Sequence, residues 1–374
     1  MAARSYDVVA LTSNDLVTDQ RMQRCMHSLA GAGYRCSLLG RERPASQALP
    51  LVEDYDQERH RLGAHAGKRF YLELARAHYR RLLELRPRAV LAVDLDTVIP
   101  AARAAARLGI PWVYDAHELF TEQPEVARRP WIRASWSLVG QRYVDRARAA
   151  YTVGDAIARE LTGRYQIPFE VVRNVPHTQA RLSPKPDGPP PSPFTVLYQG
   201  ALNEGRGLEE LIDAARELPS IRVWIAGDGP LAADLRRRAR DRRVGNVEFL
   251  GELPPERLRE LTPRADLGYA LMRDVSRNYY LSLSNKSLDY IHAGLPSMQM
   301  NWPEYAALDE QYGCYHLTDE LSVEAVIDGV EACRELRYHA LLREGCRRAA
   351  AELTWAREER RLLNIWREVL GDAP

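Results

Sequence analysis

The fold class follows from one stretch of sequence, FTVLYQGALNEGRGLEELIDAARELPSIRVWIA, at residues 194–226. The stretch indicates a buried strand over 194–198, a glycine-rich loop, a helix over 208–218 and a second strand over 221–226. Strands that alternate with helices predict βαβ units, a parallel sheet and helices on both faces of it. The stretch therefore predicts a doubly wound α/β domain.

The same alternation extends in both directions along the chain. In the first half we expect helices over 19–32 and 98–108, and strands at 6–11, 36–39, 89–93, 111–115 and 171–175. After residue 226 we expect helices over 231–240 and 255–261, strands at 247–250 and 267–271, and a mostly helical remainder that ends in a helix over 354–370. This order predicts two Rossmann-like domains.

The boundary between the domains is marked by LSPKPDGPPPSP at 182–193, where six of twelve residues are proline. Such a segment forms neither helix nor central strand and predicts a stiff linker. We therefore expect a first domain over 1–181, a second over 194–352 and a C-terminal helical segment over 353–374. Ligands of such sheets bind beyond the carboxyl ends of the strands, which predicts a site in a central cleft.

Composition excludes several classes of protein. The 374 residues are 45% hydrophobic and 28% charged, and 52 basic against 51 acidic residues lack the excess that a nucleic-acid binder needs. The five cysteines form no C-x-x-C pair, which argues against a disulfide framework or a zinc site. No apolar run approaches the length of a membrane span and no signal peptide is apparent, so we expect a cytoplasmic protein.

Charge is divided unevenly between the two halves. Residues 1–180 hold 26 basic and 20 acidic residues, a net charge of +6, and the rest of the chain carries −5. A basic first half suits an anionic acceptor or peripheral contact with the inner face of a membrane. The alternative is ordinary solvated helix faces in an arginine-rich chain, since only Lys68, Lys185 and Lys286 are lysines.

Two segments of the second half are suited to phosphate. In the loop over 200–207, three glycines and Arg206 precede a helix N-terminus, although turn glycines beside an unrelated arginine would look similar. In SNKSLDYIHAGLP at 284–296, Ser284 or Asn285 caps a helix that carries Lys286 and Asp289 on one face. The ammonium suits a phosphate and the carboxylate suits a ribose diol; the alternative is a surface ion pair.

Taken together, several short motifs resemble the retaining GT-B glycosyltransferases of the family-4 type, which use nucleotide sugars. In the second half the similar segments are Arg206-Gly207, the turn GDGP at 227–230, FLG at 249–251 and NKSLDYIHAGLP at 285–296. In the first half they are DQRM at 19–22 and YDAHELF at 114–120.

The resemblance implies a fold, a reaction and a donor site. It implies transfer of a sugar from a UDP- or GDP-linked donor to a hydroxyl acceptor with retention, and a C-terminal helix that crosses back to the first domain. It implies that Arg206 and Lys286 neutralise the diphosphate, and that the base lies near 251–253. The donor-binding residues it implies are Gly200, Arg206, Gly229, Leu253, Leu283, Ser284, Asn285, Lys286 and Asp289.

In the first half, His117 is the candidate catalytic residue. It follows a strand end and could bond the donor sugar or accept the proton of the acceptor; the alternative is a structural histidine. The other candidates for contacts to the acceptor or to phosphate are Arg21, Asp115, Glu118 and Arg173.

Two departures from the family pattern leave other functions open. Leu281 stands where the family often has a glutamate, and Ala201 where it often has an arginine. A nucleotide-sugar 2-epimerase and a non-catalytic sugar-nucleotide-binding subunit are the alternatives. Asp94-Leu95-Asp96 matches the letters of a metal motif but lies in the acceptor half, so we expect a metal-independent enzyme without a cofactor.

Overall fold

The computed structural model describes residues 6–17, 19–176 and 193–372. The chain divides into two compact units: a first unit of Met1–Asn174 with Ala356–Pro374, and a second unit of Val175–Trp355. The predicted proline-rich linker over 182–193 lies, apart from Pro193, outside the described residues.

A seven-stranded parallel sheet forms the centre of the first unit, in the order β3-β2-β1-β4-β5-β6-β7. Its strands are β1 (Val8–Leu11), β2 (Cys36–Arg41), β3 (Asp56–His60), β4 (Ala89–Val93), β5 (Trp112–Ala116), β6 (Ala149–Thr152) and β7 (Glu170–Val171). β1 and β4 are buried along their whole length because helices cover both faces of the sheet.

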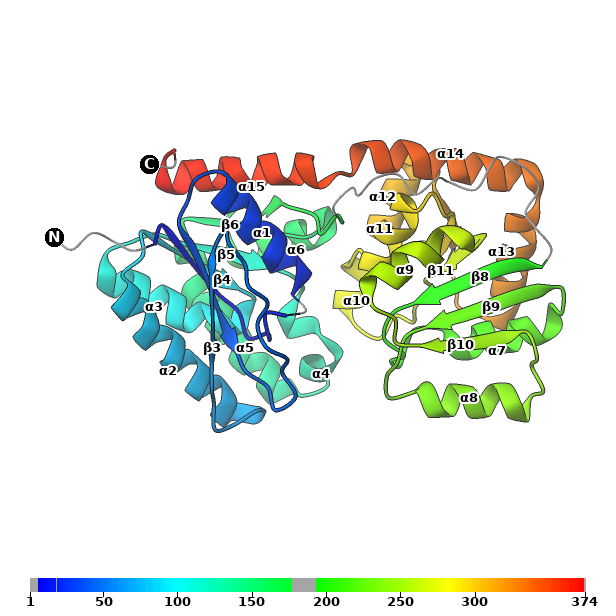
Figure 1. Cartoon of the computed structure of the whole chain (residues 1–374), viewed down its shortest axis with the longest axis horizontal. Helices are drawn as coiled ribbons and strands as arrows, with labels where there is room; N and C mark the ends of the chain where they lie inside the picture. The colour runs from blue at the N-terminus through cyan, green and yellow to red at the C-terminus, as the bar shows by residue number, and fades with distance from the viewer. Residues whose placement is uncertain (1–5, 18, 177–192, 373–374) are drawn as a thin grey trace. The chain divides into compact units, whose positions relative to one another are not determined.

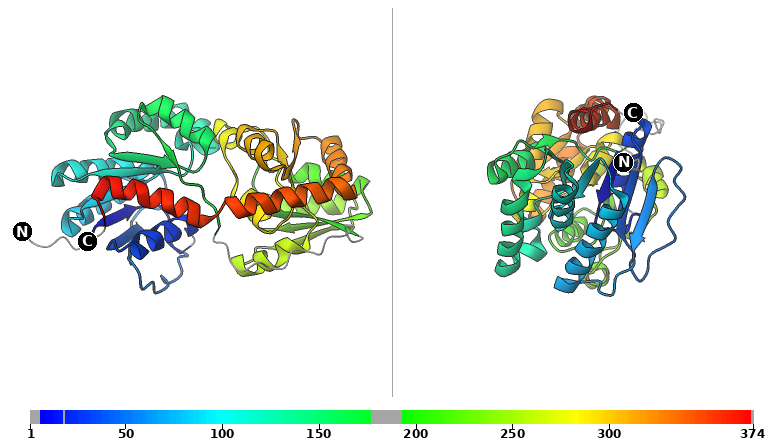
Figure 2. Two further views of the ribbon diagram at one scale, coloured as in Figure 1. Left: turned by 90° about the horizontal axis from the view of Figure 1, so that it is seen from above. Right: turned by 90° about the vertical axis from the view of Figure 1, so that its left-hand side faces the viewer.

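Helices α1 and α15 lie on one face of this sheet, and α2, α3 and α5 lie on the other (Figures 1 and 2). The helices are α1 (Gln20–Gly31), α2 (Gly67–Leu85), α3 (Val98–Leu108), α4 (Pro124–Ala127), α5 (Pro130–Tyr143), α6 (Asp155–Tyr165) and α15 (Trp355–Leu370). Two hydrogen bonds hold the C-terminal end of α15, from residues that lie just before β2 and β4. The Tyr34 hydroxyl donates to the Gly371 carbonyl at 2.7 Å, and Arg88 donates to the Leu370 carbonyl at 3.0 Å.

The second unit contains a six-stranded parallel sheet in the order β10-β9-β8-β11-β12-β13. Its strands are β8 (Phe194–Gln199), β9 (Ile221–Ala226), β10 (Val247–Gly251), β11 (Leu267–Tyr269), β12 (Ser297–Met300) and β13 (Tyr315–Thr318). Two parallel, Rossmann-like sheets confirm the predicted fold class. In each sheet the strand order reverses once, beside β1 in the first unit and beside β8 in the second, where such folds bind ligands.

The helices of the second unit include α7, which begins two residues after Arg206, and α11, which carries Lys286. They are α7 (Leu208–Glu217), α8 (Ala232–Asp241), α9 (Pro255–Leu261), α10 (Arg277–Leu281), α11 (Asn285–His292), α12 (Pro303–Tyr312), α13 (Val323–Arg334) and α14 (Leu336–Glu352). Short 3₁₀ turns lie at Leu95–Thr97, Phe120–Glu122, Val144–Arg146 and Thr262–Arg264.

Three sequence-based predictions of secondary structure differ from the structure. The expected strand over 171–175 is only β7, which ends at Val171, and the expected strand over 267–271 ends at Tyr269. The stretch expected to be mostly helical contains β12 and β13. β12 (Ser-Met-Gln-Met) is only four residues long and has no β-branched or aromatic residue, so its strand signal is weak.

His78 on α2 is fully buried and should make the first unit sensitive to acid. Burial, together with the neighbouring His60, lowers the pKa of this imidazole to about 3; its bond to the Thr12 carbonyl, at 3.3 Å, acts in the opposite direction. The folded state therefore resists a proton that the unfolded chain accepts below its usual pKa of about 6.5.

We expect the free energy of unfolding to fall, through His78, as the pH drops from about 6.5 towards 3, by at most about 1.4 kcal/mol per pH unit. Gln can donate the same bond and does not titrate. The difference in the free energy of unfolding between wild type and His78→Gln, measured by urea titration, should therefore change with pH. The exposed His27→Gln is the matched control. A difference between wild type and H78Q that stays constant from pH 7 to 4 would contradict this prediction.

Candidate functional site

Three loops of the second unit are tied together at the carboxyl edge of its sheet. The Gly200 amide donates to the Ala226 carbonyl at 2.9 Å, and the Gly227 amide donates to the Gly251 carbonyl at 2.7 Å. A Cβ on Gly227 would lie 1.9 Å from the Gly200 carbonyl oxygen, and its φ is +152°, so only glycine fits there. The GDGP turn is therefore needed for the packing of these loops.

These loops enclose a pocket of about 640 Å³ at the ends of β8, β9 and β10. Three of the predicted donor-binding residues, Gly200, Gly229 and Leu253, line it. The full lining is Gly200, Ala201, Ala226, Gly227, Asp228, Gly229, Glu252, Leu253 and Leu258.

The two predicted phosphate-binding cations lie near this edge, each against an aromatic ring. The Lys286 ammonium nitrogen is 3.9 Å from the centre of the Tyr198 ring, and the Arg206 guanidinium carbon is 4.7 Å from that of Tyr279. Loss of solvation lowers the pKa of Lys286 well below its usual range, and the nearby Arg206 guanidinium lowers it further. Within the described part of the chain neither cation forms an ion pair, so an anion bound here would relieve their repulsion.

Asp289 belongs to α11, and its side chain lies beside the carboxyl end of β8. One of its carboxylate oxygens accepts a bond from the Gln199 side-chain amide at 3.2 Å, and Gln199 in turn accepts from the Thr262 hydroxyl at 2.8 Å. A Cβ on Gly200, the residue after Gln199, would be 3.6 Å from the Lys286 ammonium. The carboxyl end of β8 therefore brings Arg206, Lys286 and Asp289 together.

The N-terminus of α11 carries the remaining donor-site candidates. Ser284 occupies the N-cap position, but its side chain makes no capping bond, and its amide donates to the Tyr305 hydroxyl at 3.2 Å. Leu283 is buried in the core, whereas Asn285, the first helical residue, is exposed. In an eight-residue helix the first amides are free to bind a ligand unless something caps them.

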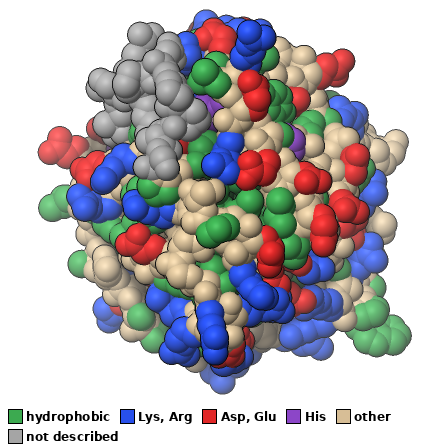
Figure 3. Space-filling model, turned by 90° about the vertical axis from the view of Figure 1, so that its right-hand side faces the viewer, with side chains coloured by type: hydrophobic (Ala, Val, Ile, Leu, Met, Phe, Trp, Pro, Cys, Tyr) green, Lys and Arg blue, Asp and Glu red, His purple; other side chains and the backbone are tan. Residues whose placement is uncertain are grey.

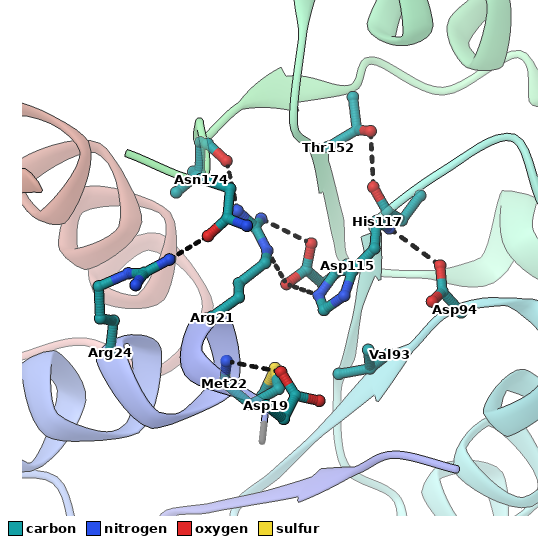
Figure 4. A network of polar contacts seen from close by, with 12 residues as sticks. Asp19, Arg21, Met22, Arg24, Val93, Asp94, Asp115, His117, Thr152 and Asn174 are labelled. Carbon is teal, nitrogen blue, oxygen red and sulfur yellow. Dashed lines mark hydrogen bonds and ion pairs between the residues drawn. The ribbon is translucent and has the colours of Figure 1, made fainter. Parts of the chain in front are cut away.

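In the first unit, His117 belongs to a buried network of charged groups at the end of β5 (Figure 4). Its Nε2 lies 3.0 Å from Oδ2 of Asp115, whose carboxylate also accepts two bonds from the Arg21 guanidinium, at 2.9 and 3.3 Å. Arg21 also donates to the Val172 carbonyl at 2.8 Å. Arg21 and Asp115 are 4% and 0% exposed, so this structure uses both to hold each other and His117 in place.

The network determines the charge of His117. Burial disfavours the imidazolium, but the Asp115 carboxylate outweighs that effect and raises the pKa of His117 to about 9. The ring is therefore protonated at neutral pH and acts as a hydrogen-bond donor. Of the two predicted roles, contact with an oxygen of the donor sugar fits this charge, and acceptance of a proton does not.

Asp94, at the end of β4, is held in an unusual backbone conformation. Its φ of 56° with ψ of 170° is a region that side chains other than glycine rarely adopt. Its Oδ1 accepts the His117 amide at 2.9 Å, and burial raises the pKa of this carboxyl well above its usual range. The D-x-D pattern alone did not indicate this conformation, because backbone strain leaves no mark in a single sequence.

The strain at Asp94 can be measured with a pair of variants. Asp94→Ala and Asp94→Gly both remove the carboxyl group, but only glycine relaxes at φ of 56°, so D94G should be more stable than D94A by about 1–2 kcal/mol. Urea unfolding of the two variants measures this difference. At Ala102 on α3, where the helix requires ordinary φ, glycine should instead be the less stable residue. A D94A variant as stable as D94G would show that the backbone is unstrained.

The last two candidates of the first unit, Glu118 and Arg173, have partners within that unit. The Glu118 carboxylate accepts a bond from the Gln123 side chain. Arg173 pairs with Asp155, and its amide donates to Glu358 of α15 at 2.9 Å. Their contacts with substrate remain predictions.

Tyr198 and Tyr279 are site residues that the sequence did not suggest. Tyr198 lies in a strand that was expected to be simply buried, and Tyr279 lies in α10, within the stretch that was expected to be mostly helical but without bounds for this helix. The tyrosines place an aromatic face beside each cation, and such a face attracts a positive charge.

The residues that the structure describes show neither a metal site nor a membrane span. Among 6–17, 19–176 and 193–372, no group of three or more His, Cys, Asp or Glu side chains is placed to hold a metal ion. Nor is any helix of that part both long and apolar enough to cross a bilayer.

Comparison with known families now adds to this geometry. Residues 18–178 match the model of a glycosyl transferase 4-like domain, and residues 193–333 match that of glycosyl transferases group 1. The chain belongs to the GT-B glycosyltransferases of the family-4 type. The two matches together span most of both units.

Similar proteins agree on the fold of this glycosyltransferase. Sucrose-phosphate synthase from Thermosynechococcus elongatus superimposes with a TM-score of 0.80 at 14% identity, over 97% of this chain and 98% of that one. HepE from Anabaena, in complex with UDP and glucose, gives 0.76 at 14% identity over 96% and 99%. WaaG, a glycosyltransferase involved in lipopolysaccharide biosynthesis, gives 0.72 at 15% identity over 96% and 99%.

One curated relative matches over a short segment. O-antigen chain mannosyltransferase C from Escherichia coli is 45% identical over 60 residues. The match covers 16% of this chain and 16% of the length of that protein.

Proposed function

We propose that this chain transfers a glycosyl group from a nucleotide diphosphate sugar to a hydroxyl acceptor, with retention at the anomeric carbon. The observation that carries the proposal is the pair of unpaired cations, Arg206 and Lys286, beside a pocket of about 640 Å³. Two positive charges near each other are costly unless an anion joins them, and a diphosphate carries the charge to do so.

The parts of the donor are assigned to neighbouring features of the second unit. The diphosphate lies between Arg206, Lys286 and the first amides of α11. Asp289 accepts bonds from the ribose hydroxyls, and the base lies in the pocket beside Leu253. HepE, which has a similar fold, is known with UDP-glucose bound, which supports a nucleotide-sugar donor for this chain.

Catalysis in this proposal consists of stabilising a departing diphosphate. As the bond between sugar and phosphate breaks, negative charge grows on the phosphate oxygens, and Arg206, Lys286 and the α11 amides stabilise that charge. The acceptor hydroxyl attacks from the same face of the sugar and gives its proton to the leaving phosphate oxygen. A pair of carboxylates of the glycosidase kind is not required. The protonated His117 donates a hydrogen bond to a sugar oxygen.

The donor is tested by a thermal-shift panel of UDP, GDP, UMP and GMP. A ligand that binds only the folded chain raises its melting temperature, and we expect a diphosphate to raise it more than its monophosphate. Equal shifts for diphosphate and monophosphate would contradict the assignment of the cations. Incubation with the nucleotide sugar alone distinguishes the 2-epimerase, which would convert the donor without an acceptor.

Metal independence is part of the proposal and has its own test. Glycosyl transfer with the preferred donor should proceed at an unchanged rate after dialysis against EDTA, because Arg206 and Lys286 supply the positive charge. A rate that falls in EDTA and returns on addition of Mg²⁺ or Mn²⁺ would contradict it.

We propose a hydroxyl acceptor on a glycan, a lipid-linked sugar or a small metabolite, bound by the first unit.

A further inference from the structure

Helix α5 exposes large apolar side chains to solvent. Of its fourteen residues only Gly140 is buried, while Trp131 and Leu138 are 87% and 67% exposed. These two are seven residues apart, which places them two turns apart on one face of the helix. Large apolar side chains that are exposed together on one face of a helix mark an interaction surface.

The opposite face of α5 already anchors the helix to the first unit. Trp136 makes edge-to-face contacts with Tyr71 and Phe120, each with ring centres 5.1 Å apart. The fold is therefore held by the inner face, and the outer pair Trp131 and Leu138 is not needed for it.

The outer surface around α5 is basic. α3 and α5 contain arginines but no Asp or Glu. The exposed Arg142 is eleven residues from Trp131 and so lies on the same face of α5, and the exposed Arg128 lies two residues before this helix. α2, α3 and α5 lie side by side on one face of the sheet (Figure 1). α2 adds Leu72, 58% exposed, with exposed basic neighbours one turn away at Lys68 and Arg76.

The surface of the second unit is different. Basic and acidic side chains are interspersed on the face seen in Figure 3. Its arginine-rich helix α8 includes Asp234 and Asp241, and α2 of the first unit includes Glu73 and Glu84. Arginines without an acidic residue in the same helix are therefore a feature of α3 and α5.

We propose that the helical layer of α2, α3 and α5 docks on an anionic lipid bilayer. Trp131, Leu138 and Leu72 enter the boundary between headgroups and acyl chains, where tryptophan is favoured, and the arginines lie at the level of the lipid phosphates. Each basic side chain near such a surface adds an attraction that salt weakens. Isolated apolar side chains spread over neighbouring helices suit a flat, fluid surface better than the pocket of a protein partner.

This inference goes beyond the proposed function, because it concerns the first unit, whereas the donor site lies in the second. It names anionic phospholipid as the ligand of the helical layer. Docking by this layer would bring the acceptor-binding unit to a membrane surface, where a lipid-linked acceptor is found.

Vesicle sedimentation of the full chain tests the proposal. We expect binding to vesicles rich in phosphatidylglycerol, little binding to pure phosphatidylcholine, and release by high salt. The double variant Trp131→Ala, Leu138→Ala should bind about tenfold less, as should Arg128→Gln, Arg142→Gln. Matched controls are Leu51→Ala, whose leucine is 99% exposed elsewhere in the first unit, and Arg240→Gln on α8; both should bind as wild type does.

The outcomes separate the alternatives. The proposal is overturned if wild type and both α5 variants sediment equally, or if the chain binds neutral vesicles as well as anionic ones. It is also overturned if the chain does not bind anionic vesicles, and that result leaves an acidic protein as the partner. All variants should keep the wild-type melting temperature and nucleotide shift, so loss of vesicle binding is not confused with misfolding or with failure of the donor-site proposal.

Discussion

Replacement of Lys286 by glutamine should weaken the binding of UDP or GDP, whichever the chain prefers, by about 10- to 100-fold, because a hydrogen bond to a charged group contributes about 1.5–3 kcal/mol. Glutamine keeps much of the length of the side chain and removes the charge. Isothermal titration calorimetry measures the change, and Lys68→Gln, an exposed lysine of the first unit, is the control.

The same lysine should couple binding to protons. Its pKa is lowered in the free protein, and a bound diphosphate stabilises the ammonium, so binding should take up a proton wherever Lys286 is partly neutral. The affinity should therefore fall as the pH rises above the lowered pKa. Titrations in buffers of different ionisation enthalpy reveal this uptake, which K286Q should abolish. A wild-type affinity in K286Q would remove Lys286 from the donor site.

Replacement of Asp115 by asparagine should lower the free energy of unfolding by about 3–5 kcal/mol, because it leaves the Arg21 guanidinium buried without its counter-charge. This loss is a large part of the stability of a typical domain. Urea unfolding measures it. The surface pair of Arg69 with Glu73 supplies the control, since Glu73→Gln should have a much smaller effect on stability.

A double variant separates stability from charge. Arg21→Met with Asp115→Leu removes both buried charges and should recover most of the stability, since apolar pairs often replace buried ion pairs at little cost. His117 then loses the carboxylate that raises its pKa to about 9, so its pKa, followed by NMR, should fall. If D115N alone is as stable as wild type, the network does not support the first unit in the way described.

The fold class was predictable because its signal is local and repeated. Strand and helix patterns such as those at 194–199 and 208–217 have different periods, and glycine or proline ends them. β12 and β13 were not predicted from the same signal, since each is only four residues long and a four-residue pattern is too short to separate a strand from a helix. Helix α5 was also not expected, because its outer face is apolar and its inner face is only partly buried.

The donor-site residues could be suggested from sequence because three motifs carry them. Gly200, Arg206, Gly229 and Lys286 belong to segments with unusual glycines or with a rare lysine. What sequence could not supply was the chemistry around them. The Tyr198 and Tyr279 rings beside the cations depend on side-chain packing, and the charge of His117 depends on Asp115 and on Arg21, which is distant in sequence.

A crystal structure of the chain with its preferred nucleoside diphosphate is the most direct test of the central claim. We predict that the diphosphate lies within hydrogen-bond distance of both Arg206 and Lys286, with the base against Leu253 and the ribose on Asp289. A diphosphate bound elsewhere, with both cations still against Tyr198 and Tyr279 and without an anion, would contradict it.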